Sequence, residues 1–292
     1  MLSIKQMIIV NTMKKYGLPS AIVEYTKNVF SLEKDNPITK QKFNKALNRF
    51  PRKVIRDIGK LVNSAAKVVG VSAEEMINSL DFHPHDFPST KIESLFSELR
   101  VINYLSDEGF NNIRFIPSKR KKRRADIRAF KDSISYIVEV TCSTSEVVSN
   151  KWTPEQILNF IIQKWNDKKS QFEDTLKEYT ECRRIALAVV LDTEDRNALT
   201  SSKDALLIAK LAWLKIGVDN LHICIITGYS DQVYDIPRNS LIHKILSFSS
   251  KKNYIKTSPF IINLLNSIIR VFYKPISSGN GNIVYPSWVQ TL

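Results

Sequence analysis

The strongest constraint on the fold is a change of pattern near residue 90, where segments typical of helices and of strands begin to alternate. In Ile92 to Asp107 the apolar residues recur at helical spacing, and Gly109 follows as a stop signal. The predicted elements are, in chain order, a helix at 92–107, strands at 113–116, 126–130 and 134–140, a helix at 153–179, a strand at 185–191, a helix at 205–216 and a strand at 221–226.

The connections between these segments predict how the strands pair. A tight turn at 131–133 joins 126–130 to 134–140, so these two strands should form an antiparallel hairpin. A helix separates 185–191 from 221–226, so these strands should be parallel neighbours joined by a crossover. The order therefore predicts an α/β fold with a mixed sheet flanked by helices.

Residues 1–88 are predicted to form a separate, basic and helical N-terminal domain. Residues 65–80 resemble a helix–turn–helix, with Gly70 in the turn and Ser72 as a cap. Glu74 and Glu75 on the second helix would repel phosphates, so two helices packed about a glycine turn are the favoured interpretation. We expect this domain to help recognise DNA or to dimerise.

The charge balance favours a polyanionic partner. Forty-three Lys and Arg stand against 29 Asp and Glu, a formal net charge of +14. The three scattered cysteines, Cys142, Cys182 and Cys224, fit neither a disulfide framework nor a CxxC zinc site, so we expect a reducing, cytoplasmic environment. No stretch approaches the roughly 20 apolar residues of a membrane span, and no membrane partner is expected.

Three acidic residues occupy informative places. Glu98 lies on the first helix of the alternating region, Asp126 starts the second strand, and Glu139 is near the end of the third. The start of one hairpin strand lies beside the end of the next, so Asp126 and Glu139 should meet. Singly, Asp126 would suit a turn and Glu139 a surface position on an edge strand. Jointly they indicate a Mg²⁺ site for phosphodiester hydrolysis, because buried neighbouring carboxylates need a cation.

The order Glu98, Asp126, Glu139-Val140-Thr141 and then the helix at 164–171 resembles the PD-(D/E)XK nuclease superfamily, over residues 91–227. The resemblance implies a restriction-endonuclease-like fold for the domain at 89–292. The sequence pattern itself predicts C-terminal helices at 241–248 and 259–272 that pack against the core. It implies a Mg²⁺-dependent endonuclease, with Mn²⁺ as a substitute, that cuts double-stranded DNA as a restriction or defence enzyme and acts as a homodimer. The implied metal ligands are Asp126, Glu139 and the Val140 carbonyl, with Glu98 at a second metal or orienting water.

Two positions depart from the family pattern. Ala125 stands where the family has Pro, and Thr141 stands where it has the Lys that positions water and stabilises negative charge. We expect Lys168 on the following helix to supply the missing ammonium, with support from Gln171. If no Lys fills this place, the chain is a DNA-binding protein of nuclease-like fold without efficient cleavage. A resolvase or repair nuclease and an RNA-directed nuclease are further alternatives.

Six basic residues immediately precede Asp126: Lys119, Arg120, Lys121, Lys122, Arg123 and Arg124. Such a run is usually a solvated loop, and a nuclear signal is another interpretation. Its place in the sequence predicts phosphate contacts at the edge of the acidic cluster, together with Lys164 from the following helix.

Overall fold

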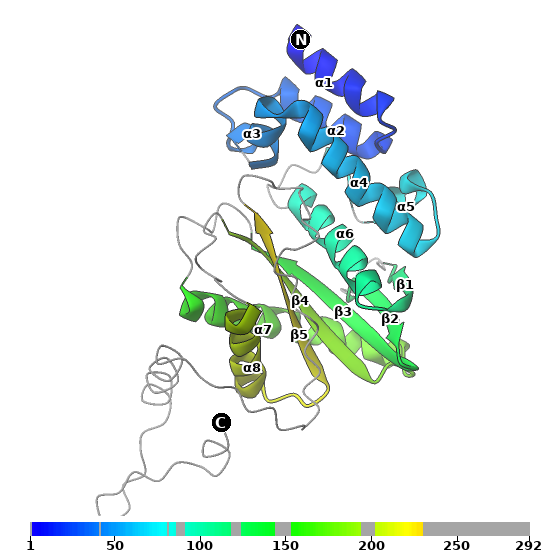
Figure 1. Cartoon of the computed structure of the whole chain (residues 1–292), viewed down its shortest axis with the longest axis vertical. Helices are drawn as coiled ribbons and strands as arrows, with labels where there is room; N and C mark the ends of the chain where they lie inside the picture. Colours follow the sequence, from blue (N-terminus) through cyan, green and yellow to red (C-terminus); the bar gives the residue numbers. More distant parts are fainter. Residues whose placement is uncertain are drawn as a thin grey trace, which may run out of the picture. The chain divides into compact units, whose positions relative to one another are not determined.

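A five-stranded mixed sheet carries the alternating part of the chain. The computed structural model describes residues 2–40, 42–80, 82–85, 91–117, 124–143, 153–193 and 202–229, all within one unit, Met1–Ser247. The expected helices at 241–248 and 259–272 lie outside the described residues. The elements are, in chain order (Figure 1), α1 (Ile4–Lys15), α2 (Ser20–Ser31), the 3-10 helix η1 (Pro37–Lys40), α3 (Lys42–Arg49), α4 (Pro51–Val69), α5 (Ala73–Ser79), α6 (Lys91–Asp107), β1 (Asn111–Phe115), β2 (Ile127–Lys131), β3 (Ile134–Cys142), α7 (Pro154–Glu178), β4 (Arg184–Thr193), α8 (Ser202–Ile216) and β5 (Leu221–Tyr229).

The strand pairing confirms the predicted α/β class with a mixed sheet. The order is β1-β2-β3-β4-β5, with β1, β2 and β3 antiparallel in succession and β3, β4 and β5 parallel. Asp132 and Ser133 join β2 to β3, and both have positive φ, as a type I′ hairpin turn requires. Thr153 forms the expected capping box with Gln156 at the start of α7.

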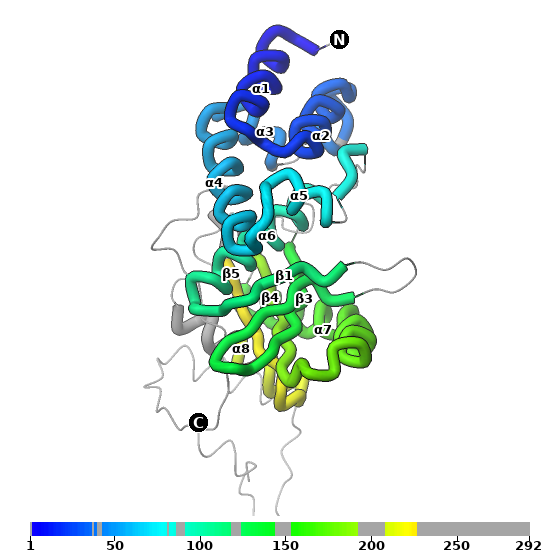
Figure 2. The backbone as a smooth tube through the Cα atoms, turned by 90° about the vertical axis from the view of Figure 1, so that its right-hand side faces the viewer, coloured from blue at the N-terminus to red at the C-terminus, as the bar shows by residue number. Residues whose placement is uncertain are grey.

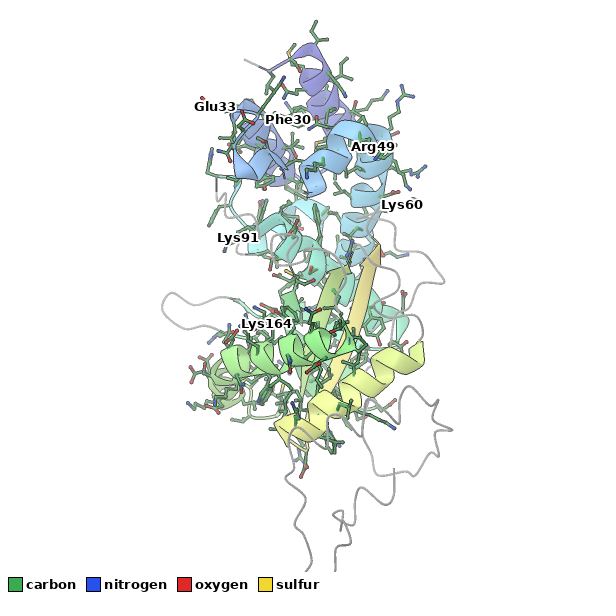
Figure 3. The ribbon with its side chains drawn as sticks, turned by 90° about the vertical axis from the view of Figure 1, so that its left-hand side faces the viewer. Phe30, Glu33, Arg49, Lys60, Lys91 and Lys164 are labelled. Atoms are coloured by element: carbon green, nitrogen blue, oxygen red, sulfur yellow. The ribbon has the colours of Figure 1, made fainter. Side chains whose placement is uncertain are left out.

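Helices cover both faces of the sheet. Tyr136, Val138 and Val140 of β3 belong to one hydrophobic core with α6, so the alternating residues of that strand, Glu139 among them, face the side covered by α7. Figure 2 shows α6 between the N-terminal helices and the strands, and Figure 3 shows α7 and α8 crossing in front of the strands. The centre of β3 is therefore enclosed from both sides.

The N-terminal helices share their core with the sheet. Buried residues from α1, α2, α3 and α4 form one continuous cluster with those of α6 and of β1 to β5. At the end of α4 the Arg114 guanidinium of β1 donates a hydrogen bond to the Val69 carbonyl oxygen. The helical segment is thus joined to the sheet by apolar packing and by a polar contact at the end of α4.

The connection between α4 and α5 fits two helices packed about a glycine turn. Gly70 adopts the left-handed conformation at φ 78° and donates its N–H to the Ala66 carbonyl, which ends α4. Ser72 caps α5 in a capping box with Glu75. Glu74 accepts hydrogen bonds from the backbone N–H, at 2.9 Å, and the hydroxyl of Ser20. Glu74 therefore joins α5 to the start of α2, and Glu75 stabilises the first turn of α5 itself.

Two further observations concern the state of the cysteines and the length and polarity of the helices. Cys142, Cys182 and Cys224 are free thiols, and Cys182 lies 2.8 Å from the Ser135 hydroxyl. None of the helices in the described part of the chain combines the length and the apolar character needed to cross a membrane.

Two glycines on or beside α4 should respond oppositely to alanine. Gly70→Ala places a side chain at φ 78°, which costs roughly 1–2 kcal/mol. Gly59 lies inside α4 with no atom within 4 Å of an added Cβ, so Gly59→Ala should stabilise the protein by roughly 0.5–1 kcal/mol. Urea unfolding monitored by circular dichroism measures both changes. Equal signs for the two variants would contradict the assignment of Gly70 to the helix end.

Candidate active site

Asp126 lies across the hairpin from Glu139. Its backbone N–H donates to the Val138 carbonyl oxygen at 3.2 Å, and its carboxylate accepts a hydrogen bond from the Val140 N–H at 2.7 Å. The pairing of Ile127 with Val138 continues the same alignment into β2. Asp126 thus makes contacts on both sides of Glu139, and the expected approach of these two acidic residues is present in the structure.

Glu139 is a fully buried carboxylate paired with an ammonium. Its side chain is 0% exposed, and its Oε1 lies 2.5 Å from the Lys168 Nζ of α7. The Lys168 side chain is 30% exposed, so this side chain is partly accessible to solvent whereas the Glu139 side chain is not. Thr141, two positions after Glu139, is buried and carries no charge. Lys168 therefore reaches the strand from the following helix, and its role in catalysis stays a prediction.

Glu98 completes the acidic group from the opposite layer. It lies on α6, largely buried, and its Oε1 accepts a hydrogen bond from the Ser94 hydroxyl at 3.5 Å. Burial raises the pKa of Glu98 well above its usual range, and the charges of Asp126 and Glu139 raise it further. Glu98 therefore lies within electrostatic range of both strand acids.

The pKa values of all three carboxyl groups are raised, so each group keeps its proton to a higher pH than usual. Burial is the main cause that raises the pKa of Glu139 well above its usual range, and Asp126 adds to it. Burial likewise raises the pKa of Asp126 to about 6, although the Val140 N–H and Lys168 oppose the shift. One ammonium balances one carboxylate, so the remaining negative charge needs protons or another cation.

The donor atoms fit a hard divalent cation that keeps other ligands. Within the described ranges no group of three or more His, Cys, Asp or Glu side chains could hold a metal ion. Mg²⁺, however, commonly takes one or two carboxylates and completes its shell with water and phosphate oxygens. The buried Oε2 of Glu139 accepts no hydrogen bond from the described residues. The Val140 carbonyl points to the same side of β3 as its N–H, which faces Asp126.

Gln171 contacts the backbone that leads into Asp126. Its side-chain amide nitrogen donates to the Arg124 carbonyl oxygen at 3.3 Å, so it holds this backbone, and its expected support of Lys168 stays a prediction. Thr175, which the sequence reasoning missed, acts beside it. The Thr175 hydroxyl donates to the Gln171 carbonyl oxygen at 2.6 Å and accepts from the Ala125 N–H at 2.9 Å. Its spacing of four from Gln171 was the only available signal.

Arg124 corrects the expectation for the end of the basic run. Its side chain is 5% exposed and forms an ion pair with Glu178 of α7, and it also donates to the Pro117 carbonyl oxygen at 3.2 Å. A buried and paired guanidinium is not available to a phosphate. The expected contacts of residues 119–123 lie outside the described residues.

Lys164 lies on α7, one turn before Lys168 (Figure 3). It is partly buried, with its Nζ 5.3 Å from the centre of the Phe160 ring. The role of Lys164 in phosphate binding stays a prediction.

The raised pKa of Asp126 predicts a pH dependence of stability. Because the folded pKa of about 6 exceeds the usual 3.8, folding binds a proton, and this stabilisation is lost as pH rises from about 4 through about 6. In a chelator, Asp126→Asn should remove this loss and be more stable than the parent at pH 8 by on the order of 2 kcal/mol. Asn keeps the oxygen that accepts the Val140 N–H. Urea unfolding across pH, with exposed Asp167→Asn as control, tests this, and an unchanged pH profile would contradict it.

The Thr175 hydroxyl should matter more than its methyl group. Thr175→Val leaves the Ala125 N–H without its acceptor and should cost about 1–3 kcal/mol of unfolding free energy. Thr175→Ser keeps both hydrogen bonds and loses one methyl group, about 0.8 kcal/mol. Thermal and urea unfolding compare the variants. If the valine variant proves as stable as the serine variant, the hydroxyl does not hold this backbone.

Comparison of the chain with protein-family models, with curated proteins and with solved structures finds no match in any of the three. The site is therefore interpreted from its own geometry.

Proposed function

We propose that this chain is a Mg²⁺-dependent endonuclease that hydrolyses phosphodiester bonds in DNA. One observation carries the proposal: Asp126 just before β2, Glu139 on β3 and Lys168 on α7 share one largely enclosed place, with Glu98 in electrostatic range. A carboxylate pair beside an ammonium is the set of groups that metal-assisted phosphodiester hydrolysis uses.

The order of the elements supports a restriction-endonuclease-like fold of the PD-(D/E)XK kind. A helix carrying Glu98 precedes an antiparallel hairpin carrying Asp126 and Glu139, and a helix and a parallel strand follow. The contact of Lys168 with Glu139 supports the interpretation that this helix supplies the ammonium absent at Thr141. The assignment to the superfamily remains part of the proposal.

Each residue of the site would have its own role in the reaction. Asp126, Glu139 and the Val140 carbonyl would hold Mg²⁺, with Mn²⁺ as a substitute, which would supply polarisation of the phosphoryl oxygens and a lowered pKa of water. The Lys168 ammonium, beside Glu139 and open to solvent, would orient the attacking water and stabilise negative charge on the phosphoryl group. Glu98 would orient water or bind a second ion. The water oxygen would form a bond to phosphorus as one P–O ester bond breaks, with the water giving up a proton to solvent and the departing sugar oxygen taking one from solvent.

A restriction or defence enzyme that acts on double-stranded DNA is the subclass we favour. The net charge of +14 supports a polyanionic substrate. A homodimer would place one site on each strand of a two-fold DNA target. Resolvase, repair and RNA-directed activities are the alternatives within the same chemistry.

Plasmid cleavage tests the proposal. With Mg²⁺ or Mn²⁺ the protein should nick or linearise supercoiled plasmid, and Asp126→Asn and Glu139→Gln should abolish this activity. Lys168→Ala should lower the rate by roughly 10²–10³-fold, the effect of removing one charge-stabilising donor. Exposed neighbours on α7 provide matched controls, Asp167→Asn and Lys169→Ala, which should cleave like the parent.

The same assay separates the alternatives. Cleavage that prefers four-way junctions supports a resolvase, and cleavage of structured RNA without cleavage of DNA supports a ribonuclease. Equal activity in the parent and in Glu139→Gln would show that the proposed site does not cut.

A second candidate function is DNA binding without cleavage. The specific observation in its favour is that Lys168 already neutralises Glu139, while Thr141 supplies no further ammonium. This candidate predicts that Mg²⁺ leaves the melting temperature of the parent unchanged at pH 8. The endonuclease proposal predicts that Mg²⁺ raises it in the parent and not in Glu139→Gln.

A further inference from the structure

Positive charge is concentrated on α3 and α4, away from the candidate active site. Residues 42–69 contain eight Lys and Arg but a single acidic residue, Asp57. Asp57 is 7% exposed, and its Oδ1 lies 3.3 Å from the Arg56 Nε. The exposed surface of this stretch therefore presents positive charge without an exposed acid.

The basic residues of α4 lie on one face of a firmly packed helix. The exposed positions Arg52, Arg56, Lys60, Asn63 and Lys67 follow one another at spacings of three and four, which places them in a single stripe. The opposite face, with Ile55, Ile58 and Leu61 among its members, is buried in the shared core. At 1.5 Å per residue the stripe is about 22 Å long. Lys45 and Arg49 on α3 are exposed and precede it in the chain.

These charges are poorly neutralised within the protein. In the part of the chain that the structure describes, Arg52, Lys60 and Lys67 form no ion pair with an acidic side chain. The first turn of α4 also has no acidic residue and no side-chain cap, so the positive end of the helix adds to the potential. By contrast, the first N–H of α2 is met by the Glu74 carboxylate.

The acidic residues of the helical segment lie elsewhere. Glu33 is on the opposite side of the segment from Arg49 and Lys60 (Figure 3). Glu74 and Glu75, on α5, are engaged by Ser20 and Ser72. These three acidic residues therefore do not neutralise the stripe on α4.

We propose that the basic face, formed by Lys45, Arg49, Arg52, Arg56, Lys60 and Lys67, binds the phosphate backbone of double-stranded DNA without reading its sequence. A duplex carries one negative charge per about 1.7 Å of axis, so it offers continuous charge along the whole stripe. Asn48, Asn63 and Ser64 are exposed beside the basic residues and supply neutral hydrogen-bonding groups of the kind that contact phosphates. The inference rests on the proposed function only in choosing DNA as the polyanion.

The proposed DNA contact lies on a different helix from the one that the helix–turn–helix resemblance at 65–80 would predict. In that motif the second helix enters the major groove. Here the second helix, α5, is short and starts with Glu74 and Glu75, whereas the preceding α4 carries the basic stripe. DNA would therefore lie along α4.

Fluorescence anisotropy of a labelled duplex, recorded in a chelator so that no cleavage occurs, tests the inference. The triple variant Arg52→Gln, Lys60→Gln, Lys67→Gln removes three unpaired charges, and Gln keeps a high helix propensity. The matched control Lys14→Gln, Lys27→Gln, Lys34→Gln removes three exposed charges elsewhere in the helical segment. Circular dichroism verifies that both triples are folded.

The α4 triple should bind the duplex at least about tenfold more weakly than the parent near 100 mM salt, and its slope of log K against log salt should be smaller by about 2–3. The control triple should keep the affinity of the parent within about twofold. Equal losses in both triples would overturn the inference, because they would show that total charge, not this face, governs binding. Absence of binding by the parent, or equal displacement of the duplex by polyglutamate, would overturn it as well.

The result is independent of the cleavage test. Loss of plasmid cutting in Glu139→Gln with unchanged binding of the α4 triple would refute the basic face and leave the endonuclease proposal standing. Weakened binding of the α4 triple, in a protein that does not cut plasmid under any condition, would support the basic face and refute the endonuclease proposal.

Discussion

The burial of the Glu139 carboxylate in the centre of β3 is the constraint on which the rest of the site depends. A charge there is costly unless it is paired, and the Lys168 ammonium at 2.5 Å supplies one partner. Asp126 across the hairpin and Glu98 from α6 add two further acids to the same region. Among the described residues, three carboxyl groups thus share this region with the Lys168 ammonium, and full ionisation of all three would leave negative charge that this ammonium does not balance.

Helix α7 determines the geometry of this site from a single face. Lys168, Gln171 and Thr175 lie on successive turns and contact, in order, the Glu139 carboxylate, the Arg124 carbonyl and the Ala125 N–H. One helix therefore holds β3 and the backbone that leads into β2, and with them the distance between the two strand acids. Because Arg124 also pairs with Glu178 on α7, this part of the chain is held by side chains and backbone together.

Much of the fold was predictable because each element carries its own periodicity. The helix at 92–107, the 131–133 turn and the capping box at Thr153 are local patterns, and the structure contains all three. The approach of Asp126 and Glu139 followed from hairpin geometry alone. The sequence did not predict the ion pair of Arg124 with Glu178 or the contact of Gln171 with the Arg124 carbonyl oxygen. Their contacts depend on where α7 packs against the sheet. Neither the residue types nor their spacing in the sequence indicates that position. Thr175 escaped notice for the same reason, since a helical threonine has no distinctive pattern.

The single hydrophobic core has a consequence for the acidic residues. Keeping like charges together in a dry environment opposes folding, and the opposing free energy must come from apolar burial elsewhere. In this chain that burial extends from β3 through α6 to Ile55, Ile58 and Leu61 of α4. Helices that contribute no group to the carboxyl cluster thereby offset its electrostatic strain, so losses of packing in the N-terminal segment would leave less free energy to hold the acids together.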